Sequence, residues 1–185
     1  MMPELSLHVL DIAQNSIRAQ ATLVIIRVHA NTADDHLTIT VEDNGCGMSP
    51  EQVARVTDPF FTTRTTRKVG LGISFFKMAA EAADGEFSII SQEGIGTTVT
   101  AGFQLSHIDR IPLGDMTATI HTLIMMNPDM DFVYDYQVDD RGFVLDTREM
   151  REILGDVPLN TPDVGAYIKE YLTENKKDTD GSTVL

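Results

Sequence analysis

Four stretches in the first part of the chain are predicted to be β-strands, because apolar and polar residues alternate at 37–41 and 97–105 and residues 22–30 are rich in Val and Ile. The stretches cover residues 22–30, 36–42, 86–92 and 97–105. A polar loop at 31–35 joins the first two, and a glycine-containing turn at 93–96 joins the last two. The pattern therefore predicts two antiparallel hairpins.

A helical period predicts an amphipathic helix over residues 4–20, with Leu5, Val9 and Ile12 on its apolar side. Four polar side chains form another line of this helix at spacings of three, four and three: His8, Asp11, Asn15 and Arg18. A solvated face is the simple interpretation of this line. Asn15 is a poor helix former in mid-helix, however, which suggests a further role.

The remaining pattern places two more helices in the first part of the chain and a second group of elements after residue 105. The helices are expected at 50–56 and 73–83, and the second group at 115–126, 132–138, 143–145, 147–154 and 162–174. We therefore predict an α+β protein with a first domain at 1–105, a small acidic α+β domain at 106–174 and a flexible tail at 175–185.

Composition limits the class of protein. The chain has 185 residues, 42% of them hydrophobic, which is enough for a core, and it shows neither a signal peptide nor a run long enough to span a membrane. One cysteine excludes an internal disulfide framework and fits a reducing compartment, so we expect a soluble cytoplasmic protein.

The net charge of −14 argues against nonspecific binding to nucleic acid or to an anionic membrane, since both favour clustered Lys and Arg. Residues 104–185 carry 7 basic and 16 acidic side chains. Partners should accordingly be neutral, basic or bridged by a metal ion.

An acid followed by two glycines stands where the second predicted strand ends. Gly45 and Gly47 allow the main chain to approach a ligand closely, and Asp43 offers an acceptor for an exocyclic amine, which suits adenine. An Asx-Gly turn without a ligand is the alternative interpretation. Cys46, between the glycines, is expected to be a small packing residue, because no base accompanies it.

Residues 57–69 show no clear period and combine the aromatic pair Phe60-Phe61 with three basic residues, as expected for a mobile loop over an anion. The loop ends in Gly70-Leu71-Gly72, directly before the apolar helix at 73–83. Glycines at a helix N-terminus expose free N–H groups and the positive end of the helix dipole, which favours phosphate.

Five motifs in this order resemble the successive boxes of the Bergerat-type ATP-binding domain. They are Asp11-x-x-x-Asn15, Asp43-x-Gly45-x-Gly47-Met48, Pro59-Phe60-Phe61-Thr62-Thr63-Arg64, Gly70-Leu71-Gly72 and Gly94-x-Gly96-Thr97. That superfamily includes sensor histidine kinases, anti-sigma kinases, MutL mismatch-repair ATPases and gyrase-type topoisomerases, and the short loop looks most like the histidine-kinase branch. The resemblance covers residues 4–105 and implies a two-layer α/β sandwich, with a mixed, mainly antiparallel sheet and helices on one face.

The resemblance also implies site residues for ATP and Mg²⁺. Asp43 would accept a hydrogen bond from the adenine amino group with support from Thr97, and Asn15 would supply an amide oxygen to Mg²⁺. Three residues would line the base and ribose: Gly45, Gly47 and Met48. The phosphates would lie at the N–H groups of Gly70, Leu71 and Gly72, with charge from Arg64, Arg67 or Lys68.

Two departures from the family pattern concern catalysis. The general base of the hydrolysing and serine-kinase members is a glutamate four residues before the magnesium asparagine, whereas here it is Asp11, one methylene shorter. Lys68-Val69 replaces the extra glycines that usually precede Gly-Leu-Gly, which implies a less mobile loop and slow turnover.

A phosphoacceptor histidine normally precedes the ATP domain of a histidine kinase, but only three residues precede the first predicted helix, so we do not expect a whole sensor kinase. Residues 106–113 partly match a phosphoacceptor box through His107, Arg110, Pro112 and Leu113, although the acid is displaced to Asp109. A linker leaving the last strand is the simpler interpretation.

Three functions remain open from the sequence. The first is a stand-alone cytoplasmic kinase or ATP-dependent regulator that acts on a partner protein through the acidic C-terminal unit. The second is a non-catalytic switch in which ATP binding alone changes the partner surface. The third is a MutL-type ATPase whose loop closure controls dimerisation, against which the short loop counts.

Overall fold

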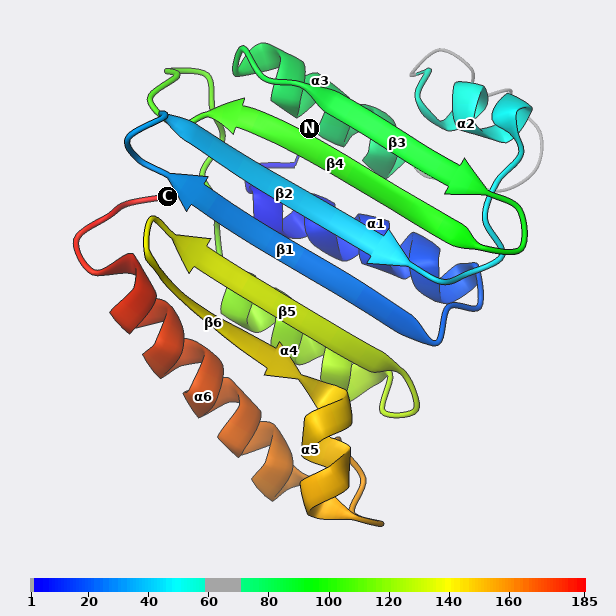
Figure 1. Cartoon of the computed structure of the whole chain (residues 1–185), viewed down its shortest axis with the longest axis vertical. Coiled ribbons are helices and arrows are strands. Elements are labelled where there is room, and N and C mark those ends of the chain that lie inside the picture. The colour runs from blue at the N-terminus through cyan, green and yellow to red at the C-terminus, as the bar shows by residue number, and fades with distance from the viewer. Residues whose placement is uncertain (1, 59–70) are drawn as a thin grey trace.

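Six strands form one mixed sheet in the computed structural model, which describes residues 2–58 and 71–185 (Figure 1). Their bounds are β1 Leu23–Asn31, β2 His36–Asp43, β3 Phe87–Gln92, β4 Gly96–Gln104, β5 Asp131–Val138 and β6 Arg141–Asp146. The order across the sheet is β3-β4-β2-β1-β5-β6, and only β1 and β5 pair in parallel. The predicted mixed, mainly antiparallel sheet is confirmed.

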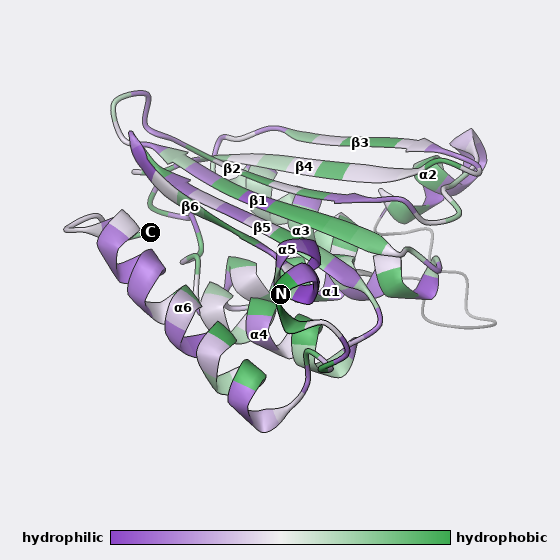
Figure 2. Cartoon of the chain, turned by 60° about the horizontal axis from the view of Figure 1, so that its bottom comes forward, coloured by the Kyte–Doolittle hydropathy of each residue, from purple (hydrophilic) through white to green (hydrophobic). Residues whose placement is uncertain are grey.

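The helices lie on one face of this sheet, so the predicted two-layer α+β architecture is also confirmed (Figure 2). Their bounds are α1 Leu5–Arg18, α2 Pro50–Val56, α3 Leu71–Ala82, α4 Met116–Met126, α5 Thr147–Leu154 and α6 Pro162–Asp180. Alternate residues of each central strand point into the layer between sheet and helices, and those on the other side remain partly exposed.

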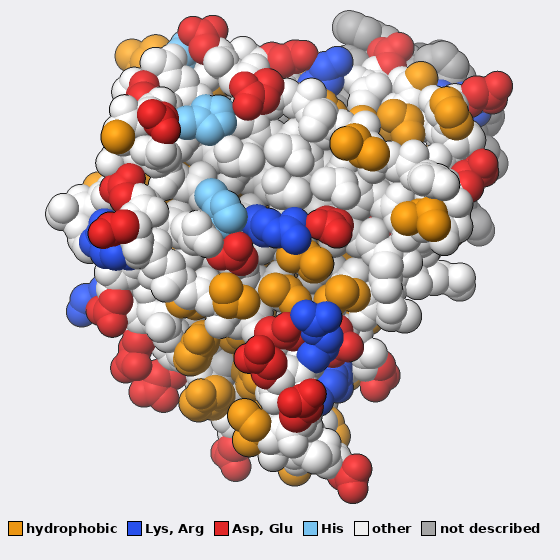
Figure 3. Space-filling model, in the orientation of Figure 1, with side chains coloured by type: hydrophobic (Ala, Val, Ile, Leu, Met, Phe, Trp, Pro, Cys, Tyr) orange, Lys and Arg blue, Asp and Glu red, His pale blue; other side chains and the backbone are white. Residues whose placement is uncertain are grey.

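The open face of the sheet carries polar side chains and two ionic contacts (Figure 3). Arg27 pairs with Glu42 at 2.8 Å and His29 contacts Asp135 at 2.9 Å, each across neighbouring strands. These half-exposed pairs order the surface but contribute little to stability. The apolar core lies entirely on the opposite, helix-covered side.

The C-terminal part differs from the separate domain that the sequence predicts at 106–174. β5 pairs with β1 along eight residues, from Leu23 opposite Asp131 to Ala30 opposite Val138. The alternating apolar side chains of β5, such as Tyr134 and Tyr136, are buried in the same core as those of β1. Residues 106–174 therefore extend the first sheet, because the free edge of β1 offers both hydrogen bonds and an apolar layer.

The predicted flexible tail is likewise replaced in part by structure, since α6 continues to Asp180. Asp180 accepts a hydrogen bond from the hydroxyl of Tyr136 at 2.5 Å and pairs with Lys176 one turn earlier. Burial and this carboxylate raise the pKa of Tyr136, so the hydroxyl stays protonated as a donor. These contacts to β5 hold the last turns of the helix.

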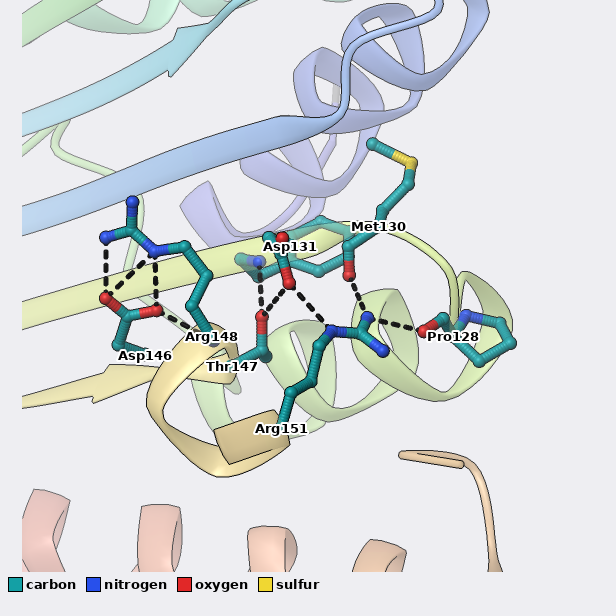
Figure 4. Close-up of polar contacts among 8 residues, drawn as sticks. Pro128, Met130, Asp131, Asp146, Thr147, Arg148 and Arg151 are labelled. Atoms are coloured by element: carbon teal, nitrogen blue, oxygen red, sulfur yellow. Dashed lines mark hydrogen bonds and ion pairs between the residues drawn. The ribbon is translucent and has the colours of Figure 1, made fainter. Parts of the chain in front are cut away.

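The short helix α5 is fixed to the start of β5 by polar contacts (Figure 4). Thr147 accepts a hydrogen bond from the Phe132 backbone N–H at 2.8 Å and donates to Asp131 at 3.2 Å. Arg151 donates to the same carboxylate at 2.8 Å and to the carbonyl of Met130 at 2.8 Å. The position of α5 thus depends on a network around Asp131 rather than on apolar packing alone.

Candidate nucleotide site

Asp43 ends β2 with both carboxylate oxygens held in place. The Ser16 hydroxyl of α1 donates to Oδ2 at 2.6 Å, and the Gly45 N–H donates to Oδ1 at 2.8 Å. Ser16 itself is buried, which keeps water from competing for this contact. Because each carboxylate oxygen has two lone pairs, the anchored group can still accept a hydrogen bond from a ligand amine.

The glycines beside Asp43 are required by close contacts. A Cβ at Gly45 would lie 2.8 Å from the Cβ of Ala19, and one at Gly47, where φ is +67°, would lie 1.9 Å from the carbonyl oxygen of Gln92. The Cys46 N–H donates to the Ala19 carbonyl at 2.9 Å. The turn is therefore packed between the end of α1 and the β3–β4 hairpin, where only glycine fits.

Thr97 stands directly opposite Asp43 on the neighbouring strand β4. Its hydroxyl lies 2.8 Å from the hydroxyl of Ser91, which also accepts a hydrogen bond from the Met48 N–H at 2.8 Å. The structure thus brings Asp43, Met48 and Thr97 together at one end of the sheet. Ser91 and Ser16 were missed by the motif comparison; the hairpin register could have indicated Ser91, whereas the sequence of α1 contains no signal for Ser16.

Asp11 on α1 reaches the first turn of α3. A Cβ built on Gly72 would lie 1.8 Å from Asp11 Oδ2, so only glycine fits opposite this carboxylate. α3 begins at Leu71, two residues earlier than the sequence predicts. The first turn of a helix carries its free N–H groups, so the predicted base and the predicted phosphate cradle adjoin one another.

Asn15, the predicted magnesium residue, is half-buried one turn beyond Asp11. Its Oδ1 accepts a hydrogen bond from the guanidinium of Arg18 at 3.2 Å. Among the described residues, no group of three or more His, Cys, Asp or Glu side chains could hold a metal ion. One amide oxygen fits Mg²⁺ only when phosphate oxygens and water complete the coordination.

Some of the predicted phosphate-end residues lie outside the described residues. These are Arg64, Arg67, Lys68 and Gly70, together with the Phe60-Phe61 loop and the side chain of Leu71. Their predicted roles stay predictions. A cavity of about 520 Å³ does occur elsewhere, between His29, Asn31, His36 and Asp139, but it opens at the other end of β2 from Asp43.

His8 departs from the polar line of α1 on which the sequence places it. The side chain is fully buried, stacks on Phe76 of α3 with ring centroids 5.6 Å apart, and has no hydrogen-bond partner at either ring nitrogen. Burial lowers the pKa of His8 from 6.5 to about 4. His8 is thus a neutral core residue between two helices of the site, because α3 covers that side of α1.

Replacing His8 with leucine should remove one source of acid sensitivity. The unfolded state binds a proton at His8 below pH 6.5 but the folded state only near pH 4, so folding stability falls as the pH is lowered through this window. This group alone should cost up to about 2 kcal/mol between pH 7 and pH 5. Urea unfolding at both pH values measures this loss of stability. The loss should be absent in His8→Leu and present in the control His36→Gln, which replaces a half-exposed histidine.

Cys46 is exposed, so the expectation that it packs inside the glycine turn is wrong. The backbone of Cys46 makes the packing contacts instead, since its N–H bonds to Ala19 and its carbonyl accepts from the Gly94 N–H at 2.8 Å. The side chain consequently points to solvent beside the turn.

His107 lies beyond the other end of β4 from Thr97. Seven residues of extended chain separate Thr97 from Gln104, a distance of roughly 24 Å. The ring lies 3.4 Å from the Asp84 carboxylate and accepts a hydrogen bond from the Asp109 N–H at 3.2 Å. In this conformation His107 therefore lies far from the Asp43 end of the sheet, and its role as a phosphoacceptor stays a prediction.

Comparison with known proteins identifies relatives of the first part of the chain. The family model described as histidine kinase-, DNA gyrase B-, and HSP90-like ATPase matches residues 3–107. The sensor protein kinase FleS of Pseudomonas aeruginosa is 40% identical over 92 residues, which are 50% of this chain and 23% of that protein. A putative sensor protein of Shewanella frigidimarina is 33% identical over 104 residues, covering 56% of this chain and 16% of its own length. The chain therefore spans less than a quarter of the length of these relatives.

Solved structures share the fold at low sequence identity. The MutL ATPase domain of Aquifex aeolicus complexed with ADP gives a TM-score of 0.50 at 14% identity, covering 94% of this chain and 88% of that chain. The N-terminal domain of a DNA repair protein gives 0.53 at 16% identity, covering 78% and 52%. None of the described helices is long and apolar enough to cross a membrane. Because the family model covers more than half of the chain, the protein belongs to the histidine kinase-, DNA gyrase B- and HSP90-like ATPase family.

Proposed function

We propose that the protein binds ATP together with Mg²⁺ in the cytoplasm and acts on a partner protein as a histidine-kinase-like kinase or ATP-dependent regulator. The observation that carries the proposal is the Asp43 carboxylate, which Ser16 and Gly45 anchor beside a turn that only glycine can form. An anchored acceptor with free lone pairs recognises the amino group of adenine. Guanine presents a carbonyl oxygen at the same position and would be repelled.

The other residues of the site complete a pocket for the nucleotide. Gly45, Gly47 and Met48 would line the base and ribose, and Thr97 would support the adenine edge through its hydroxyl or a water molecule. The first turn of α3 would hold phosphate oxygens with its N–H groups. Asn15 would bind Mg²⁺, which neutralises phosphate charge when it is present.

The position of Asp11 supports a catalytic role. Its carboxylate adjoins the first turn of α3, where the phosphates would lie, so it could polarise a water molecule or a hydroxyl for attack. The shorter side chain, compared with a glutamate, reduces its reach. The short reach of Asp11 favours the second candidate function, in which ATP binds without turnover and shifts the protein between two partner-binding states.

Titration calorimetry with ATP, with and without Mg²⁺, tests the proposal. The wild-type protein should bind ATP more tightly with Mg²⁺ than without it. Asn15→Ala should reduce the affinity measured with Mg²⁺ by roughly tenfold, because one metal ligand is missing. Gln14→Ala removes an exposed amide from the same helix and serves as the control, with unchanged binding. Absence of any binding heat in the wild-type protein would exclude the proposed function.

A further inference from the structure

The helices α1 and α4 pack against one another in the helix layer (Figure 2). A shallow apolar groove lies between them. It has a volume of about 280 Å³. Its lining includes Leu10, Gln14, Ile17, Arg18, Leu123 and Met126. α4 lies outside the residues that the family model matches, so one wall of the groove belongs to the part of this chain beyond the ATPase domain.

One wall is formed by Leu10, Gln14 and Ile17 of α1. These three residues repeat at spacings of four and three, so they share one helix face. Met126 on the opposite wall is 75% exposed, and Leu7, which continues the same face of α1 beyond the groove, is 37% exposed. Large apolar side chains at this exposure favour a binding surface, and a flexible methionine can adapt to what it contacts.

The volume of the groove favours inserted side chains over a small-molecule ligand, because ligand pockets are typically about 300–1,000 Å³ and enclose their ligand. A groove between two packed helices suits a third helix that inserts apolar residues at spacings of three and four. The occupant is therefore expected to be an amphipathic helix.

Arg18 determines the charge of that occupant. It is the single charged residue among those that line the groove, and no carboxylate within residues 2–58 and 71–185 forms an ion pair with it. The net charge of −14 disfavours acidic partners over the rest of the surface, so the acidic residue is expected only beside Arg18. A partner with an acidic residue beside its apolar face would meet this cation, whereas a basic partner would be repelled by it.

We propose that the groove between α1 and α4 binds an acidic amphipathic helix of a partner protein, and that Arg18 couples this binding to the nucleotide. Arg18 now donates to Oδ1 of Asn15 at 3.2 Å. A partner carboxylate that binds Arg18 would draw the guanidinium away from this amide oxygen and neutralise the positive charge beside the proposed Mg²⁺ ligand. The coupling rests on the proposed function, but the docking does not, and linkage makes the coupling reciprocal.

Two synthetic helical peptides of equal length test the docking. Both carry leucines at spacings of three and four; one has glutamates beside the leucines and the other has lysines. Fluorescence anisotropy should show about tenfold tighter binding of the glutamate peptide, and Arg18→Gln should abolish that preference. A stronger response to the lysine peptide would contradict the proposal, because it would show general attraction to the acidic surface.

Point variants and methionine signals locate the peptide. Met126→Glu should weaken binding of the glutamate peptide by at least about tenfold, whereas Ile108→Glu, at a side chain 93% exposed before α4, should not. With methyl-labelled methionine, the Met126 signal, assigned by Met126→Leu, should shift on binding. Loss of binding in Ile153→Glu instead, on exposed α5, or an unshifted Met126 signal, would place the peptide elsewhere and overturn the proposal.

A nonhydrolysable ATP analogue with Mg²⁺ tests the coupling. It should tighten binding of the glutamate peptide at least about fivefold in the wild-type protein and leave Arg18→Gln unchanged. If the wild-type protein binds the analogue but the peptide affinity stays the same, the coupling is refuted. If the protein does not bind the analogue at all, the proposed function fails, while the measurements without nucleotide still decide the docking.

Discussion

Asp43→Asn is expected to weaken ATP binding by about one hundredfold, equivalent to about 3 kcal/mol. The carboxylate accepts from Ser16 and from Gly45, and the adenine amino group would be a third donor. An amide has one acceptor oxygen and turns an NH₂ group toward one of these donors, so at least one contact is lost and another becomes repulsive. Calorimetric titration of both proteins with ATP and Mg²⁺ measures the change.

Asp140→Asn, in the exposed turn between β5 and β6, is the matched control and should leave ATP affinity unchanged. The preference among bases provides a second readout. The wild-type protein should bind ATP much more tightly than GTP, and Asp43→Asn should reduce this preference because an amide can donate to the guanine carbonyl. Equal affinities of wild type and Asp43→Asn for ATP would show that Asp43 does not contact the base.

Asp11→Asn is expected to lower turnover or phosphoryl transfer by at least about one hundredfold while ATP affinity stays within about threefold of the wild type. The substitution keeps the shape of the side chain, so the contact with Gly72 is preserved and only the basic group is removed. Steady-state phosphate release and transfer of labelled phosphate to the partner protein measure the activity. Calorimetry measures the affinity separately.

The outcome distinguishes the two candidate functions. Turnover that survives in Asp11→Asn would contradict the assignment of Asp11 as the base. Turnover that is absent from both proteins, with ATP bound by both, would favour the non-catalytic switch.

The local elements could be predicted from the sequence because each depends on neighbouring residues. Alternation or a high content of apolar β-formers between turns identified the strands, and Ser49-Pro50 marked the start of α2, where Ser49 indeed accepts from the Gln52 N–H. The pairing of β5 with β1 could not be predicted. An alternating pattern indicates a strand, but it does not indicate the strand with which it pairs. This is why a separate C-terminal domain was predicted.

The candidate site could be predicted where chemistry fixes the spacing along the chain. Asp43, the glycines and Thr97 converge because strand ends bring them together. The burial of His8 could not be predicted from a helical projection, because its angle lies at the border between the polar line and the apolar face, and only the position of α3 decides it. Ser16 could not be predicted for a related reason, since only the folded structure brings its hydroxyl to the Asp43 carboxylate.

The pairing of β1 with β5 also sets the order in which the protein can become complete during synthesis. Leu23 pairs with Asp131, 108 residues later in the chain, so the middle of the sheet lacks one neighbour until β5 has left the ribosome. Contacts so distant in sequence form slowly because a long loop must first close. Until then the β1 edge stays open to other strands, and a chain cut after residue 105 would keep it open permanently.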